Sequence, residues 1–189
     1  GKNGIIVMDD ADLNLALDGV IWGGYGTTGQ RCTAASRVIV HEKIKEKFEK
    51  MLVSRIKKLR LGNGLNPRTD VGPLINKAAQ EKSKNYTEIG LNEGAKLLVG
   101  GKIPRMNGFF FEPTLFTDCS IDMIISQEEI FGPIVSLIPV KDFDEAIEVM
   151  NSVEYGLSSS IYTKDMRKAF LAIQRIEAGI TYINASTIG

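Results

Sequence analysis

Short apolar runs alternate with longer segments of helical periodicity along this chain. Runs rich in β-branched residues predict buried strands. The expected strands cover residues 5–8, 36–41, 95–99, 134–140, 158–163 and 179–184, with short extended pieces at 109–111 and 114–116 around Pro113. Apolar residues at helical spacing predict helices. The expected helices cover residues 13–21, 44–59, 77–92, 143–151 and 165–176.

This alternation indicates an α/β fold with three layers, in which helices flank a largely parallel sheet. No repeat, low-complexity tract or internal linker interrupts residues 1–189, so we expect a single domain. Residues 61–76 (LGNGLNPRTDVGPLIN) are dense in Gly, Pro, Asn and Asp and predict a long irregular loop. The chain begins just before a buried-looking segment and ends without a polar tail, so we expect it to belong to a longer protein.

Composition excludes several classes of partner. Hydrophobic residues make up 43% of the chain and charged residues 24%, which is typical of soluble globular proteins. The 23 basic and 23 acidic residues cancel, so no electrostatic signature points to nucleic acid or to an anionic membrane. The apolar runs are too short to span a bilayer, and the first residues do not resemble a signal peptide. We therefore expect a small-molecule partner.

Cysteine and histidine usage limits the chemistry further. Cys32 and Cys119 are the two cysteines, they form no CxxC pair, and His41 is the single histidine. This pattern gives neither a disulfide framework nor metal-ligand spacing, so no metal is expected and a cytoplasmic location is favoured. His41 ends an apolar run and lacks an evident partner, so we expect a structural role rather than a catalytic one.

A glycine-dense segment delivers one cysteine just before a predicted strand. Residues 23–37 read GGYGTTGQRCTAASR and place Cys32 between Arg31 and Arg37. Small neighbours leave room for a substrate, and the arginines favour a thiolate over a thiol whose ordinary pKa is about 8.5. A small buried hydrophobe is the structural alternative for Cys32, and the residues alone leave both open. Cys119 follows Asp118, which raises a thiol pKa, and is expected to be the poorer nucleophile.

Two further motifs have simple explanations. Residues 24–29 match the GxGxxG pattern of dinucleotide-binding loops, but they follow a predicted helix and precede a strand, which is the wrong context. Glu128 and Glu129 are adjacent and therefore point to different faces, so they are not a paired-carboxylate site. Either both are solvated, which is the usual state of Glu, or one binds ligand hydroxyls, positioned by residues 130–133.

Several segments resemble the NAD(P)-dependent aldehyde dehydrogenase superfamily. Residues 29–33 with 36–38 resemble its catalytic-cysteine signature, and residues 128–133 resemble its second hallmark. Residues 67–75 and 155–158 resemble further blocks at suitable spacing. The resemblance covers essentially the whole chain and implies that residues 1–189 are the catalytic domain of such an enzyme.

The resemblance implies a mechanism and a set of site residues. The Cys32 thiolate attacks the aldehyde carbon, and the Cys32 N–H and an Asn side chain hold the thiohemiacetal oxyanion. Hydride passes to the nicotinamide of NAD or NADP, and a Glu-activated water hydrolyses the thioester. Glu129 matches the glutamate that binds the nicotinamide-ribose hydroxyls, and Phe131 the aromatic residue beside the nicotinamide. Asn184 and Thr187 fall in the substrate-anchoring loop.

The sequence also departs from the family pattern. The general-base Glu belongs to a Glu-Leu-Gly-Gly-Lys motif, of which only Gly1 and Lys2 are present. The base, the oxyanion Asn, the Rossmann-type domain that binds most of the cofactor and the oligomerisation arm are expected outside these residues. We therefore expect the 189-residue chain alone to be inactive, and the whole protein to be a homo-oligomer.

Substrate and subclass stay open at this point. The residues before Cys32, namely Arg31 with Thr27 and Thr28, resemble those of family branches that act on semialdehydes carrying a carboxylate. Its guanidinium either pairs with that carboxylate or faces away and tunes Cys32. A CoA-acylating or acyl-phosphate-reducing relative is one alternative, because such relatives lack the upstream base. A non-catalytic fragment that serves subunit contact is another.

Overall fold

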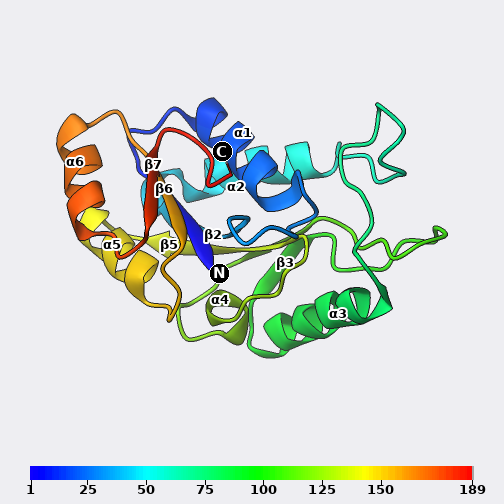
Figure 1. Cartoon of the computed structure of the whole chain (residues 1–189). Helices are drawn as coiled ribbons and strands as arrows, with labels where there is room; N and C mark the ends of the chain where they lie inside the picture. Colours follow the sequence, from blue (N-terminus) through cyan, green and yellow to red (C-terminus); the bar gives the residue numbers. More distant parts are fainter. Residues whose placement is uncertain (189) are drawn as a thin grey trace.

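The computed structural model describes residues 1–188, which form a seven-stranded sheet between two layers of helices (Figure 1). The strands are β1 (Asn3–Val7), β2 (Ala35–His41), β3 (Lys96–Val99), β4 (Thr114–Thr117), β5 (Ile134–Val140), β6 (Ser158–Tyr162) and β7 (Ile180–Ile183). The helices are α1 (Leu13–Tyr25), α2 (Glu42–Ile56), α3 (Lys77–Asn92), α4 (Ile124–Gln127), α5 (Phe143–Asn151) and α6 (Met166–Arg175). The expected three-layer α/β fold is confirmed.

The sheet is parallel except at one edge. Its strand order is β3-β4-β5-β2-β1-β6-β7, and β3 runs antiparallel to β4. Gly4 of β1 lies opposite Arg37 of β2, which lies opposite Ser136 of β5. Because the strands are parallel, the residues that precede β1, β2, β5 and β6 share one edge of the sheet, here called the amino edge. The residues that follow these strands share the opposite carboxyl edge.

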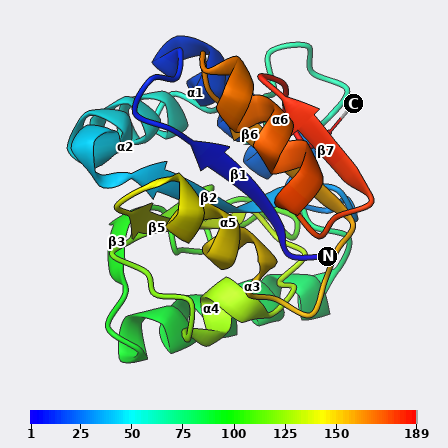
Figure 2. The same ribbon diagram turned by 90° about the vertical axis from the view of Figure 1, so that its left-hand side faces the viewer.

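Both faces of the sheet are covered, which explains why the central strands are continuous apolar runs. Val38 and Val40 pack under α1 and α2, whereas Ile39 and Ile138 pack against α3, α4, α5 and α6. Figure 2 shows α5 and α6 in front of the sheet, away from α1 and α2. Successive β2 residues thus serve two separate cores, as the period of two in a strand requires. None of the helices in residues 1–188 has the length and apolarity that crossing a bilayer requires.

Three elements differ from the sequence expectation. Helix α1 continues past Gly23 and Gly24 to Tyr25, whose buried hydroxyl donates to the carbonyl of Thr114 at 2.9 Å. Residues 109–111 are not a strand, although the neighbouring extended piece is present as β4. The short helix α4 was not predicted, because a single turn carries too little periodicity to detect.

Arg37 stabilises the fold from inside the sheet. Its side chain is 2% exposed and donates to the carbonyls of Lys2, Val149 and Met150, at 3.0, 2.7 and 2.9 Å. Val149 and Met150 belong to the last turn of α5, where the carbonyls carry the negative end of the helix dipole, and the Val149 carbonyl also accepts from Ser152. The Arg37 guanidinium therefore serves α5, and the expectation that it acts on the Cys32 thiol has no support in this geometry.

Candidate active site

Cys32 lies at the amino edge, in the loop between α1 and β2, and is exposed to solvent. Successive turns close this loop, with hydrogen bonds from Thr28 N to Tyr25 O, Gln30 N to Thr27 O and Ala34 N to Arg31 O. Thr28 and Gly29 adopt left-handed backbone conformations, with φ of 57° and 66°. The glycines that resemble a phosphate-binding pattern thus form the end of α1 and a tight reversal that leads to the cysteine.

Side chains from other parts of the chain fix this loop. The Asn3 amide nitrogen donates to the carbonyls of Cys32 and Ala34, at 2.7 and 2.9 Å, and its oxygen accepts from Ser158 N at 3.0 Å. Gln30 donates to the carbonyl of Pro73 and accepts from Ile75 N. The sequence analysis gave neither Asn3 nor Gln30 a role, since no local pattern marks a residue whose partners are distant in sequence.

Residues 128–132, called the 128–132 segment below, lie beside the cysteine loop at the same edge. An added Cβ on Gly29 would approach the Gly132 carbonyl oxygen to 2.0 Å, so the two backbones are in direct contact. Phe131 is 42% exposed and has a left-handed φ of 61°. The carboxylate of Glu129 pairs with the amino group of Gly1. A small hollow between the two segments is lined in part by Gly29, Arg31, Ser36, Glu129, Phe131 and Gly132.

Two groups at Cys32 have no partner within residues 1–188. The Cys32 backbone N–H donates no hydrogen bond, and the Arg31 side chain is exposed and forms no hydrogen bond or ion pair. A backbone donor beside an exposed thiol can stabilise an oxyanion that forms on the carbon bound to sulfur. The arrangement therefore offers a nucleophile, an oxyanion donor and a nearby cation on one fixed loop.

The structure does not bring Asn184 to Cys32. Asn184 follows β7 at the carboxyl edge, where its amide donates to Thr163 O and accepts from Thr163 N, both at 3.0 Å. The chain then turns back along β6, and Ser158 Oγ donates to the carbonyl of Thr187 at 3.1 Å. Thr187 is buried near Gly23 and Ala35, and so lies closer to the cysteine loop than Asn184 does.

The second cysteine differs in every respect. Cys119 follows β4 and donates its N–H to the carbonyl of Leu137 in the middle of β5. It is 3% exposed and lies with its sulfur 3.8 Å from the Thr117 carbonyl. Burial raises the pKa of the Cys119 thiol to about 12, and Asp118 adds to this shift. The predicted direction is confirmed, although burial rather than the acidic neighbour is the main cause. An inaccessible protonated thiol is a poor nucleophile.

Lys2 is an unexpected feature close to the site. Its side chain is 1% exposed, and its amine has no hydrogen-bond partner within residues 1–188. Burial, and next the charge of Arg37, lower the pKa of Lys2 to about 7. Burial without a hydrogen-bond partner destabilises the charged form of an amine. Lys2 therefore loses its proton far more readily than an ordinary lysine.

His41 lies at the carboxyl edge, as the last residue of β2. Its Nδ1 accepts from Lys43 N at 3.2 Å and caps α2, while its Nε2 lies 4.0 Å from the Asp9 carboxylate. These contacts support the expected structural role. Within residues 1–188, no cluster of His, Cys, Asp and Glu side chains is placed to hold a metal ion.

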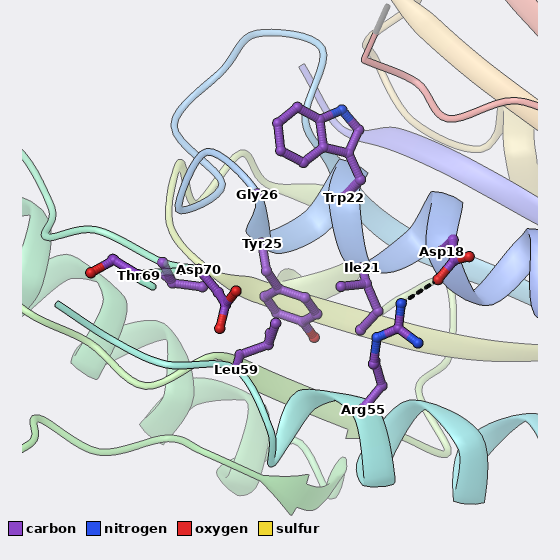
Figure 3. Close-up of a pocket in the computed structure, with 10 residues that line it drawn as sticks. Asp18, Ile21, Trp22, Tyr25, Gly26, Arg55, Leu59, Thr69 and Asp70 are labelled. Carbon is purple, nitrogen blue, oxygen red and sulfur yellow. Dashed lines mark hydrogen bonds and ion pairs between the residues drawn. The ribbon is translucent and has the colours of Figure 1, made fainter. Parts of the chain in front are cut away.

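A cavity of about 530 Å³ lies away from Cys32, between α1, the end of α2 and the loop at residues 69–71 (Figure 3). Most of its polar side chains are already partnered: Asp18 pairs with Arg55, Asp70 with Arg60, and the Tyr25 hydroxyl bonds to Thr114 O. Neither Cys32 nor Glu129 lines this cavity. Its carboxylates are paired and the described residues that line it include no cysteine nucleophile, so the candidate chemistry lies at the amino edge.

Comparison with known proteins identifies relatives of this chain. The model of the aldehyde dehydrogenase family matches residues 1–189. The betaine aldehyde dehydrogenase of Brucella anthropi is 43% identical over 189 residues, which cover 98% of this chain and 39% of that protein. The alpha-ketoglutaric semialdehyde dehydrogenase of Bacillus subtilis is 42% identical and is matched over 100% of this chain and 40% of its own length.

A solved structure of a relative has the same fold as this chain. The betaine aldehyde dehydrogenase of Staphylococcus aureus in complex with NAD+ superposes with a TM-score of 0.96 at 42% identity. The match covers 98% of this chain and 38% of that structure. The chain thus spans about two fifths of the length of the relatives it matches.

Proposed function

This chain belongs to the aldehyde dehydrogenase family, and we propose that it is the catalytic domain of an NAD(P)-dependent aldehyde dehydrogenase with Cys32 as the nucleophile. The observation that carries the proposal is the setting of Cys32. Its thiol is exposed on a loop held by Asn3 and Gln30, and the 128–132 segment lies against that loop.

The chain supplies the covalent part of the reaction. The Cys32 thiolate forms a bond to the aldehyde carbon while the carbonyl π electrons move to oxygen, which gives a thiohemiacetal oxyanion. The unpaired Cys32 N–H is available to donate to that oxygen, and Asn3 fixes the peptide on its other side. Oxidation converts this adduct to a thioester, which water hydrolyses to the carboxylate. The base that activates this water is proposed to lie outside residues 1–189.

The amino edge fits the nicotinamide-ribose end of NAD. Glu129 offers a carboxylate beside the hollow next to the cysteine loop, and Phe131 offers an exposed aromatic face in the same segment. A carboxylate accepts hydrogen bonds from ribose hydroxyls, and an aromatic side chain packs against a flat ring. When bound, NAD accepts the hydride that leaves the substrate carbon. We propose that Glu129 and Phe131 orient this end of the cofactor, and that a separate domain binds the rest.

Arg31 supports a proposal about the substrate. Its guanidinium is exposed beside Cys32 and has no partner within residues 1–188, so it is free to form a bidentate pair with a carboxylate. The Bacillus subtilis relative is named for a semialdehyde that carries such a group. We propose an aldehyde with a distal carboxylate as substrate, held by Arg31, with Thr187 as the contribution of the 184–188 loop near the cysteine loop. Asn184, which bonds to Thr163 at the opposite edge, is not part of this proposal.

Two further proposals concern the whole protein. Strand β7 is an unpaired sheet edge with Ile180 exposed, and Met166, Phe170 and Ile173 form an exposed apolar stripe on the adjacent α6. Edge strands and apolar stripes of this kind favour association, and we propose a homo-oligomer. Two cysteines without a CxxC pair form no disulfide framework of the kind typical of small secreted domains, and on this ground we propose a cytoplasmic location.

Acyl transfer to the chain itself tests the nucleophile. We expect p-nitrophenyl acetate to add one acetyl group to Cys32 of the purified chain, detected by intact mass and peptide mapping. Cys32→Ser should abolish the adduct, and Cys119→Ser should retain it. No acyl group on Cys32, or equal acylation of both cysteines, would contradict the proposal and favour a non-catalytic role.

Turnover tests the complete reaction. In an enzyme that joins this chain to a dinucleotide-binding domain, Cys32→Ser should lower NAD-dependent aldehyde oxidation by at least about 1,000-fold, because the covalent step is lost. Arg31→Ala should lower kcat/KM for a carboxylate-bearing aldehyde and leave that for a neutral aldehyde of equal length unchanged. The isolated 189-residue chain should show no NAD-dependent oxidation, and measurable turnover by it would overturn that expectation.

A further inference from the structure

The 128–132 segment is held from α3 by side chains as well as by its own backbone. The Lys82 amine donates to the carbonyl of Glu129 at 2.8 Å, and the Tyr86 hydroxyl donates to the carboxylate of Glu128. Ile130 is 2% exposed in the core, against which Tyr86 also packs. On its other side, Gly132 touches Gly29 of the cysteine loop. The segment therefore connects α3 to the loop that carries Cys32.

This segment contains a conformation that needs support. Phe131 has a φ of 61°, a left-handed conformation that is unfavourable for a residue with a side chain and persists only where the surroundings fix it. Glu129 and Phe131, the residues proposed to contact the cofactor, flank the buried Ile130.

Tyr86 is suited to give this support. Its ring is half-buried, and the Lys82 amine lies 5.6 Å from the ring centroid, so the side chain has little freedom. Burial, and next the bond to Glu128, raise the pKa of Tyr86 to about 12, so the phenol keeps its proton and remains a donor near neutral pH. A hydrogen bond to a carboxylate is stronger than one between neutral groups.

We propose that Tyr86, acting through Glu128, is a positioning residue that holds Glu129 and Phe131 in place for the nicotinamide end of the cofactor. The inference rests on the proposed function for the identity of the ligand. Glu128 itself does not contact the cofactor in this proposal. It is the attachment point by which α3 fixes the residues that follow.

The first test measures the isolated chain and needs no catalysis. Tyr86→Phe keeps the ring and removes the donor. It should accelerate hydrogen exchange about 10-fold at the amides of Glu128 and Ile134, which donate to the carbonyls of Ile124 and Gly132 at the two ends of the segment. This is the effect expected from losing one hydrogen bond to a charged group. Tyr182→Phe is the matched control, because that hydroxyl forms no hydrogen bond within residues 1–188, and it should leave these amides unchanged. Unchanged exchange in Tyr86→Phe would overturn the proposal.

The second test measures kinetics in the enzyme that includes a dinucleotide-binding domain. Tyr86→Phe and Glu128→Ala should each raise the KM for NAD+ by about 3- to 10-fold, with little change in the KM for aldehyde. Glu128→Gln keeps an acceptor and should rescue most of the effect. In the double variant, Tyr86→Phe should add nothing to Glu128→Ala, because both remove the same bond.

The outcomes separate this proposal from the proposed function. Additive effects, or a fall in kcat without a change in the KM for NAD+, would contradict a positioning role for Tyr86. If the unmodified enzyme oxidises no aldehyde, the proposed function fails. The exchange rates in the isolated chain then still decide whether Tyr86 holds the 128–132 segment.

Discussion

Polar side chains are bonded to one another at the carboxyl edge of the sheet, whereas at the amino edge the reactive groups are left free. At the carboxyl edge, Asp10 accepts from Thr163 Oγ1, Lys164 N and Asp165 N, at 2.9, 3.1 and 2.9 Å. Nearby, His41 and Lys168 hold the pKa of Asp9 below its usual range, although burial opposes this shift. The polar groups at this edge form hydrogen bonds and ion pairs with one another, so they stabilise the fold.

At the amino edge, the reactive groups are left free while the backbone beneath them is fixed. Cys32, Arg31 and Phe131 are exposed, and the Cys32 N–H has no partner within residues 1–188. Asn3 and Tyr86 hold the two segments from behind. Open α/β sheets usually bind ligands at the carboxyl ends of their strands, and here the free groups lie at the other end. Unsatisfied groups on a fixed backbone, rather than the type of edge, mark the candidate site.

Thiol reactivity gives the largest expected contrast between the free amino edge and the bonded interior of the sheet. In the folded chain at pH 7, iodoacetamide should modify Cys32 at least about 1,000-fold faster than Cys119, because a buried thiol reacts only after an opening that costs much of the global stability. Labelling rates from mass spectrometry of separated peptides provide the measurement. In denaturant the two rates should converge, and comparable rates in the folded chain would remove the contrast.

Removal of the Arg37 guanidinium tests how much this side chain stabilises the amino half of the sheet. Arg37→Met should lower the free energy of unfolding by about 2–4 kcal/mol, because the carbonyls of Lys2, Val149 and Met150 lose a charged donor. Urea denaturation of both proteins at pH 7 measures the difference. Arg55→Met is the control, because that exposed arginine pairs with Asp18 and should contribute less than about 1 kcal/mol.

A change at the carboxyl edge tests whether the two edges are independent. Asp10→Ala should lower the free energy of unfolding by about 1–2 kcal/mol, since Thr163 and two backbone amides lose their acceptor. The rate at which iodoacetamide labels Cys32 should not change below the denaturation midpoint. A slower or faster rate of labelling at Cys32 would show that the two edges are coupled, and would contradict this prediction.

The pH dependence of the free energy of unfolding reports on the ionisation of the Lys2 amine. Its pKa is about 7 in the folded chain and near 10.5 when unfolded, so above pH 7 the unfolded state binds the extra proton and stability rises with pH. Between pH 7 and 8.5 the slope from this group should reach at most about 1.4 kcal/mol per pH unit. Lys2→Met should remove that slope in urea denaturation. Equal slopes in the two proteins would mean that the Lys2 amine is not buried as described.

Much of the fold follows from local pattern. The β-branched runs at 36–41 and 134–140 identify β2 and β5, because strands covered on both faces must be apolar throughout. Asp12, Asn76 and Asp165 cap α1, α3 and α6, as the preference for such residues at helix starts predicts. Helix α4 was missed because a single turn carries too little periodicity, and the end of α1 was missed because Tyr25 is fixed by distant packing.

The sequence by itself determined the α/β fold class, the strand and helix order, and Cys32 and Glu129 as candidates, since each depends on neighbouring residues or on a resemblance carried by short motifs. Only the tertiary structure decided which candidates meet. It placed Gly29 against Gly132, turned Arg37 into the core, and sent Asn184 to the far edge. The supporting residues Asn3 and Tyr86 are joined to their partners across the fold, 29 and 42 positions away in sequence. Such contacts have no local signature, because sheet register and the packing of α3 create them.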